Sequence, residues 1–286
     1  MLNNDILCIA LYSLVLFELV YGIRHGFTSR LSAIIGVSLG LALLSKSTAS
    51  TAAVIIAFAM IGSLGWRNWR LWLSRGFITA SLAAFVSAPW YIYLDQTYGN
   101  FSGLPQLKDL QRAWNEPQGN FWNLLFNAKF VAHRWEETWG EFGWRMIHIN
   151  NTVLWIIAIP FTAALIGCFL YPSKVAIQRN VARGSFASGS IFVLAPWQAW
   201  SVGLLAITFG VAYLAIVQFG TEFSLTQARY YFPAINALAL LIMIGFRTLI
   251  PDRWLGIGQA GIVSALILLN LVIYTVYVIP FWHLPA

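Results

Sequence analysis

The residues best suited to chemistry are Arg229 and Tyr230, in a short polar stretch that leads through Pro233 into an apolar segment ending at Phe246. An arginine at the mouth of a membrane helix places a permanent cation with five fixed N–H donors at the bilayer surface. A phosphate fits such a fork, because two of its oxygens can accept parallel hydrogen bonds. Arginine and tyrosine also anchor membrane helices that bind no phosphate, so position alone leaves both roles open.

Lys46 is a second candidate for binding a phosphate. It follows an apolar run, Leu31 to Leu44, of only 14 residues. As a helix this run reaches about 21 Å, whereas the hydrocarbon core is about 30 Å thick. Lys46 therefore lies below the surface, where a lysine is unfavourable unless it faces a wet cavity or an anion. The alternative is that its long side chain extends to the surface water.

Two acidic residues could serve a reaction. Asp5 precedes the first apolar run and is our candidate for a catalytic carboxylate that positions an acceptor or a donor, although it could instead cap the helix that follows. Glu18 is the one acid well inside an apolar run. It lies about one and a half helical turns from Arg24, which favours a buried ion pair over a proton relay.

A possible divalent-metal site lies in a polar part of the chain. His133, Glu136, Glu137 and Glu141 would share one face, or nearly so, of a helix. Imidazole and carboxylate groups can bind a divalent cation, but this spacing matches no diagnostic metal motif. Solvated charges on an amphipathic helix are the better interpretation, and we assign no metal ligands and no definite cofactor.

The composition is typical of a membrane protein that crosses the bilayer several times. The chain has 286 residues, of which 59% are hydrophobic and 9% charged, against about 25% charged residues in a soluble domain. Its 14 Trp, 11 Tyr and 20 Phe suit aromatic belts at the two interfaces. The lipid bilayer is therefore an expected partner. The net charge of +7 reflects orientation in the membrane and predicts no nucleic-acid partner.

The basic residues predict which loops lie in the cytoplasm, because Lys and Arg gather on that side. Ten of the 17 fall in one alternating set of segments, and eight of the ten acids fall on the opposite side. The ten are Arg24, Arg30, Arg67, Arg70, Arg75, Lys174, Arg179, Arg183, Arg247 and Arg253. The first segment has no basic flank or cleavage site, so we expect a retained span and not a signal peptide.

Eight apolar segments satisfy this charge rule. We predict an all-α integral membrane protein with about eight transmembrane helices, forming a single membrane domain over residues 1–286. The segments are Ile6–Ile23, Leu31–Leu44, Thr48–Leu64, Gly76–Tyr93, Thr152–Tyr171, Trp197–Phe219, Tyr231–Phe246 and Gly258–Ile279.

Two connections are long. Residues 94–151 form a large extracytoplasmic loop, in which aromatic residues from Phe121 to Trp135 recur at near-helical spacing and predict a helix lying on the membrane surface. Residues 172–196 carry glycine and serine and are expected to form a cytoplasmic linker.

Five stretches, taken in order, resemble the C-terminal part of the GT-C superfamily of polyprenyl-phosphate-dependent glycosyltransferases, which includes protein mannosyltransferases and the lipid A aminoarabinose transferase. Their order, spacing and side of the membrane agree together, whereas no single motif is decisive. The stretches are Asn4-Asp5-Ile6-Leu7, Gly40-Leu41-Ala42-Leu43-Leu44-Ser45-Lys46-Ser47-Thr48-Ala49, Pro89-Trp90-Tyr91, Trp139-Gly140-Glu141-Phe142-Gly143-Trp144 and Ala228-Arg229-Tyr230-Tyr231-Phe232-Pro233-Ala234.

The resemblance implies an inverting glycosyltransferase of a prokaryotic plasma membrane, with its active face outside the cytoplasm. Such an enzyme moves a sugar from a polyprenyl phosphate to an acceptor, here unknown. Arg229, Lys46 and Tyr230 would bind the lipid phosphate and Asp5 would be the catalytic carboxylate. Family members carry earlier helices and a first outer loop with an acidic base pair. We therefore expect these 286 residues to lack that loop and to be inactive alone.

Two other functions compete with this one. A surface-polysaccharide polymerase or ligase would also place arginines and a large loop on the outer side, and hydropathy does not separate it from a glycosyltransferase. A transporter of lipid-linked sugars is less consistent with the sequence, because intramembrane charges are scarce and no inverted repeat is detectable.

Overall fold

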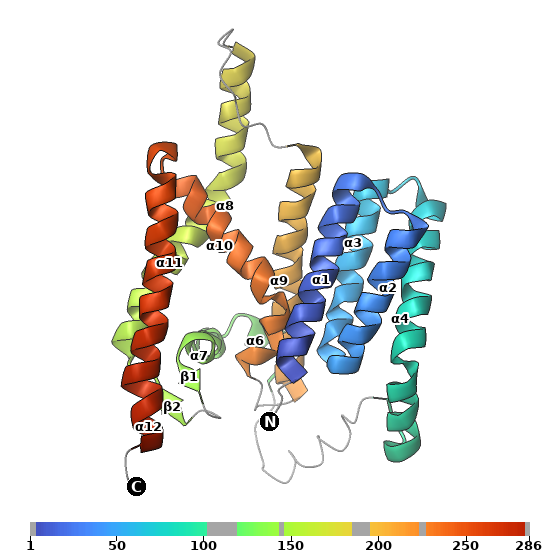
Figure 1. Cartoon of the computed structure of the whole chain (residues 1–286), viewed down its shortest axis with the longest axis horizontal. Coiled ribbons are helices and arrows are strands. Elements are labelled where there is room, and N and C mark those ends of the chain that lie inside the picture. Colours follow the sequence, from blue (N-terminus) through green and yellow to red (C-terminus); the bar gives the residue numbers. More distant parts are fainter. Residues whose placement is uncertain (1–3, 102–118, 143–145, 185–194, 223–226, 284–286) are drawn as a thin grey trace. The chain divides into compact units, whose positions relative to one another are not determined.

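Helices dominate this computed structural model of the chain, which describes residues 4–101, 119–142, 146–184, 195–222 and 227–283 (Figure 1). Seven of its helical segments are long and apolar enough to cross a membrane, and an eighth apolar helix, Ser29–Ser45, is shorter. The prediction of an all-α membrane protein with about eight spans is confirmed. The described residues group into two compact units. The expectation that they act as one membrane domain stays a prediction.

The first unit comprises residues 1–127 and 194–238. Helices α1 to α4 run side by side in it (Figure 1), and α1 supplies much of its core. Cys8, Tyr12, Val15 and Leu19 are each at most 1% exposed and recur on one face of α1 at helical spacing. The elements are α1 (Asn4–His25), α2 (Ser29–Ser45), η1 (Ser47–Thr51), α3 (Ala52–Leu64), α4 (Trp69–Tyr98), α6 (Phe121–Leu125), α9 (Pro196–Glu222) and η2 (Ala228–Ala234).

Close packing of α2 on α4 depends on two glycines one turn apart. A Cβ at Gly36 would lie 2.7 Å from the carbonyl oxygen of Thr79, and one at Gly40 would lie 2.9 Å from that of Ala83. Small residues at i and i+4 let two membrane helices approach until their backbones touch. The start of α2 is fixed by Thr28, whose side chain accepts a hydrogen bond of 3.1 Å from the backbone N–H of Leu31.

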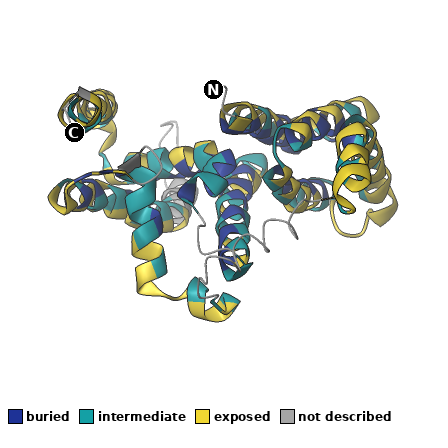
Figure 2. Cartoon of the chain, turned by 90° about the horizontal axis from the view of Figure 1, so that it is seen from below, coloured by how far each residue is buried: buried dark blue, intermediate teal, exposed yellow. Residues whose placement is uncertain are grey.

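The second unit comprises residues 128–193 and 239–286. A pair of two-residue strands connects α7 to α8, with Glu141 opposite His148 in an antiparallel ladder. The C-terminal helix has no buried residue in its most apolar window, and Figure 2 colours most of it as exposed. The elements are α7 (Ala128–Trp139), β1 (Glu141–Phe142), β2 (Ile147–His148), α8 (Asn151–Gly184), most of α10 (Ile235–Leu249), η3 (Asp252–Trp254), α11 (Leu255–Val272), the π-helical η4 (Ile273–Val278) and α12 (Ile279–His283).

Several boundaries differ from the sequence prediction, among them the ends of α8 and α4. Helix α8 continues through Pro172 to Gly184, so the first half of the expected linker at residues 172–196 is helical. A proline removes one backbone donor but does not end a membrane helix when the chain around it is packed. For the same reason α4 passes through Pro89 and ends at Tyr98. The helix expected in the long loop is present as α6 and α7.

Candidate functional site

Asp5 and Lys46 form an ion pair in the first unit, although they are 41 residues apart in sequence. Asp5 lies in the first turn of α1, and Lys46 is an extended residue between α2 and η1. Their side chains are 10% and 14% exposed. The neighbouring Asn4 donates a hydrogen bond of 3.1 Å to the backbone carbonyl of Ser45, which ties the start of α1 to the end of α2. The pair is therefore held by both of its elements.

Two cations meet at the ring of Tyr230. The Lys46 ammonium lies 4.7 Å from the centroid of this ring, and the Arg229 guanidinium carbon lies 5.7 Å from it. Both distances are within the range in which a cation is attracted to an aromatic face. Phe219 of α9 packs against the same ring with the centroids 4.9 Å apart. We call Asp5, Lys46, Arg229 and Tyr230 the Lys46 cluster.

The 3₁₀ helix η2 brings Arg229 and Tyr230 to this place. Its Tyr231 is 7% exposed and meets Phe209 of α9 edge to face, with the ring centroids 6.1 Å apart. Just after it, Asn236 donates a hydrogen bond to the hydroxyl of Ser13 on α1. Contacts with α1 and α9 thus fix the short helix from two sides. The sequence predicted that these residues lie at a helix entrance but gave no sign of which helices would hold them.

The turn that carries Lys46 is held by a residue that the sequence analysis missed. Tyr12, 1% exposed on α1, shares a hydrogen bond of 3.2 Å with the hydroxyl of Thr51 in η1. Thr51 in turn donates to the carbonyl of Thr48 at 2.9 Å. A buried phenol needs a polar partner, and here that partner is the turn after Lys46. The available signal was a tyrosine inside an otherwise apolar run.

The charge in the Lys46 cluster suits an anion. Its four residues comprise two cations and one carboxylate, and the Asp5 and Lys46 side chains are only 10% and 14% exposed. The Lys46 ammonium has three N–H donors and the Arg229 guanidinium has five. Phosphate oxygens bind such donors strongly when the surroundings have a low dielectric constant. All four residues predicted to bind or react with a substrate, Asp5, Lys46, Arg229 and Tyr230, are brought together here.

Comparison with protein-family models, curated proteins and solved structures found no match to this chain. What the structure establishes is an integral membrane protein, because its apolar helices need a lipid bilayer around them. The chemistry of the site must therefore be argued from its own residues.

Glu18 does not form the ion pair with Arg24 that its spacing suggested. The hydroxyl of Ser38 on α2 donates to the Glu18 carboxylate at 2.8 Å, and both side chains are buried. Arg24 packs instead over the ring of Trp197, 4.9 Å from its centroid. Residues six apart on a helix point in different directions, which explains why a residue from another helix is the partner.

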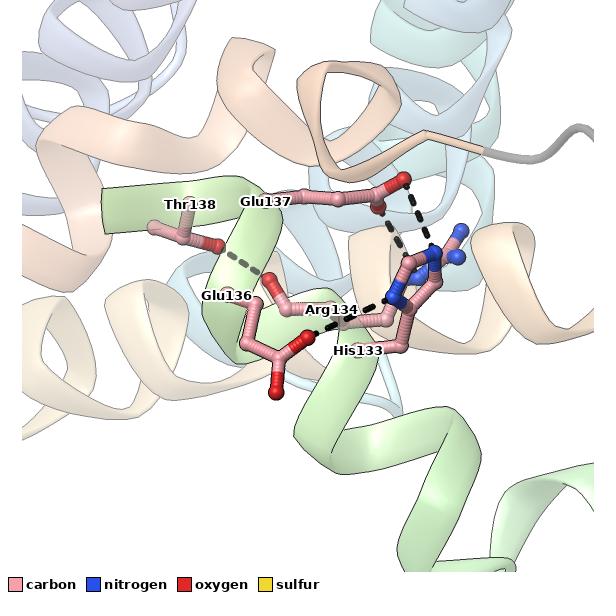
Figure 3. A network of polar contacts seen from close by, with 5 residues as sticks. All are labelled: His133, Arg134, Glu136, Glu137 and Thr138. Atoms are coloured by element: carbon pink, nitrogen blue, oxygen red, sulfur yellow. Dashed lines mark hydrogen bonds and ion pairs between the residues drawn. The ribbon is translucent and has the colours of Figure 1, made fainter. Parts of the chain in front are cut away.

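The possible metal ligands form a network on α7 (Figure 3). The two ring nitrogens of His133 lie 3.6 Å from Glu136 and 3.6 Å from Glu137, and Arg134 contacts Glu137 at 3.1 Å. These contacts join polar side chains along one helix. Among the residues that the structure describes, no group of three or more His, Cys, Asp and Glu could hold a metal ion. Glu141 lies in β1, and its side chain is outside the described part.

Proposed function

We propose that the chain is a membrane glycosyltransferase module that uses a polyprenyl-phosphate-linked sugar and an extracytoplasmic acceptor, as the resemblance to the GT-C superfamily implies. The observation that supports this best is the meeting of Lys46 and Arg229 at Tyr230. These cations come from two distant parts of the chain that the resemblance had already singled out. Ionisable side chains among membrane helices lower the stability of the fold. Such residues therefore commonly mark a functional site.

In this proposal, Lys46 and Arg229 bind the phosphate of the donor. As the bond between the sugar and the phosphate breaks, negative charge grows on the departing lipid phosphate. Two fixed cations stabilise that charge in the transition state. Tyr230 keeps both cations in place through its ring face.

Asp5 has a defined place in the same proposal. Without donor, its carboxylate holds Lys46. When the donor phosphate binds Lys46, the Asp5 carboxylate is released and can accept the proton of the acceptor group. The acceptor atom then bonds to the anomeric carbon from the side opposite the phosphate, and the lipid phosphate leaves with the bonding electron pair. This sequence inverts the configuration at the sugar carbon. Sugar transfer by these 286 residues alone would show that Asp5 takes the role of the acidic pair in the family's first outer loop.

Binding of a polyprenyl phosphate to the purified protein in nanodiscs tests the proposal. Removing one charge-assisted contact loses roughly 1.5–3 kcal/mol, so Lys46→Gln and Arg229→Gln should each weaken binding by about ten- to a hundredfold. Arg229→Lys keeps the charge but loses the planar fork, so its affinity should fall in between. Arg253→Gln is the matched control, because Arg253 also lies over the ring of the residue that follows it, at 5.9 Å.

Each variant must also show unchanged helix content and a single peak in size-exclusion chromatography. If folded Lys46→Gln and Arg229→Gln bind the polyprenyl phosphate as tightly as the Arg253→Gln control does, the Lys46 cluster is not the donor site.

A further inference from the structure

The first unit contains an apolar groove away from the Lys46 cluster. It lies between α2, α3 and α4 and has a volume of about 440 Å³, which is within the range of ligand sites. Leu39, Ile56, Met60, Trp72, Gly76 and Phe77 are among the residues that line it. All three helices are apolar, and two of them, α3 and α4, belong to segments long enough to span a membrane.

Trp72, which lines the groove, and Arg75, one turn further along α4, each carry a buried polar atom without a hydrogen-bond partner in the described ranges. Within the part of the chain that the structure describes, the indole N–H of Trp72 and the Nε–H of Arg75 are buried and donate to no acceptor. The two residues are three apart on α4 and therefore lie on one face of it. Arg75 also donates through its guanidinium to the hydroxyl of Ser29, so its side chain is directed towards the start of α2.

A third polar atom without a partner lies beside them. The hydroxyl of Ser32, which is 0% exposed, has no hydrogen-bond partner among the described residues. Thr79, one turn after Arg75 on α4, donates to the backbone carbonyl of Ser32 at 3.0 Å, which places Ser32 next to this part of α4. A buried donor that makes no hydrogen bond destabilises the fold. Three such groups on the facing helices α2 and α4 suit an acceptor with several oxygens.

We propose that this groove binds an anionic glycerophospholipid. One acyl chain lies along the apolar lining, and the phosphate oxygens accept hydrogen bonds from Trp72, Arg75 and Ser32. The charge around the groove fits this ligand, because Arg67 and Arg70 lie on the same short stretch of chain as Arg75. Membrane leaflets rich in anionic lipid attract such basic clusters.

This lipid is distinct from the donor of the proposed reaction. The contact of Arg75 with Ser29 is at the start of α2, whereas Lys46 follows its last residue. A helix of 17 residues separates the two places, which corresponds to about 25 Å. One phosphate cannot reach both places. Loss of lipid binding at the groove would therefore leave the proposed donor site unaffected, and the reverse also holds.

The acyl-chain part of the site can be blocked without disturbing the packing. A Cβ at Gly76 would meet no atom within 4 Å, and Gly76 lines the groove, so the side chain of Gly76→Leu would occupy it. Gly210→Leu on α9 is the matched control, because its Cβ is equally unobstructed and it does not line the groove. Delipidated protein would be titrated with phosphatidylglycerol or phosphatidylcholine and examined by native mass spectrometry.

Wild-type protein and Gly210→Leu should retain phosphatidylglycerol in preference to phosphatidylcholine, and Gly76→Leu should bind it at least tenfold more weakly. Trp72→Phe keeps the ring and removes its N–H, and Arg75→Gln removes the charge. Trp72→Phe should weaken the binding of both lipids, because both carry the phosphate, whereas Arg75→Gln should chiefly reduce the preference for the anionic lipid. Equal binding of the two lipids by the wild type, or unweakened phosphatidylglycerol binding by Gly76→Leu, would overturn the proposal. Displacement of the lipid by inorganic phosphate would also overturn it, since that would indicate a plain anion site.

Discussion

Gly167 of α8 and Gly245 of α10 face each other at a crossing where the two backbones touch. A Cβ at Gly167 would lie 2.2 Å from the carbonyl oxygen of Gly245, and a Cβ at Gly245 would lie 1.8 Å from that of Ala164. No side chain can be accommodated at either distance. Nearby, Lys174 donates to the carbonyl of Thr248 at 2.9 Å, which joins the same two helices again.

Gly245→Ala should therefore destabilise the second unit. Forcing a methyl group into a packed interface costs typically about 1–3 kcal/mol, even though alanine favours a helix over glycine by about 1 kcal/mol. Thermal unfolding in detergent, followed by circular dichroism, would measure the change. Gly261→Ala on α11 is the control, because a Cβ there meets nothing within 4 Å. Equal melting temperatures for the two variants would show that the crossing is looser than the structure indicates.

The Asp5–Lys46 pair should show strong coupling in a double-mutant cycle. Its side chains are only 10% and 14% exposed, so Asp5→Asn leaves a mostly buried cation and should reduce the free energy of unfolding by about 2 kcal/mol, below the 3–5 kcal/mol of a fully buried pair. The double variant Asp5→Asn/Lys46→Met should recover most of this loss. Glu136→Gln is the control, because it removes a contact between two more exposed side chains, Glu136 at 42% and His133 at 39%. It should change the free energy of unfolding little.

The buried hydrogen bond from Ser38 to Glu18 should contribute to the stability of the fold. Ser38→Ala should lower the free energy of unfolding by about 1–3 kcal/mol, because the buried Glu18 carboxylate loses its hydrogen-bond donor. Ser87→Ala is a close control, since Ser87 is 4% exposed but donates only to carbonyls of its own helix, to Ala83 at 2.8 Å and to Ala84 at 3.5 Å. Denaturant titrations of both variants would measure the difference. If Ser87→Ala lowers the free energy of unfolding as much as Ser38→Ala does, the hydrogen bond to Glu18 adds no stability of its own.

The predicted orientation of α4 can be tested by labelling. Arg67 precedes α4 and Phe101 follows it, and both are exposed. The distribution of Lys and Arg places Arg67 in the cytoplasm. In a background carrying Cys8→Ala and Cys168→Ala, an impermeant maleimide applied to intact cells should label Phe101→Cys, and Arg67→Cys only after the cells are broken. The reverse pattern would contradict the orientation.

Sequence patterns predicted the helices well and their contacts poorly. Apolar runs identified every long helix, because burial of hydrophobic side chains in lipid depends on local composition alone. The ends were less accurate at Pro89 and Pro172, where a residue that usually stops a helix in water is accommodated inside α4 and α8.

Candidate site residues were recognisable singly, but their arrangement was not. Lys46 and Arg229 stood out as cations at helix ends, yet nothing local links Lys46 to Asp5, 41 residues earlier. The same limit explains the error at Glu18, whose partner Ser38 lies on another helix, 20 residues away. Contacts between helices depend on how the helices pack, and one sequence does not reveal that packing.

The 3₁₀ geometry of η2 makes the number of residues in it as important as their identity. With three residues per turn, successive side chains point about 120° apart. Tyr231 is directed into the core, while Tyr230 meets Lys46. Deleting Phe232, which is outside the Lys46 cluster, would rotate the side chains before it by about a third of a turn relative to Pro233. The core position would then go to a neighbour, and Lys46 would lose its aromatic partner although no residue of the cluster had been replaced.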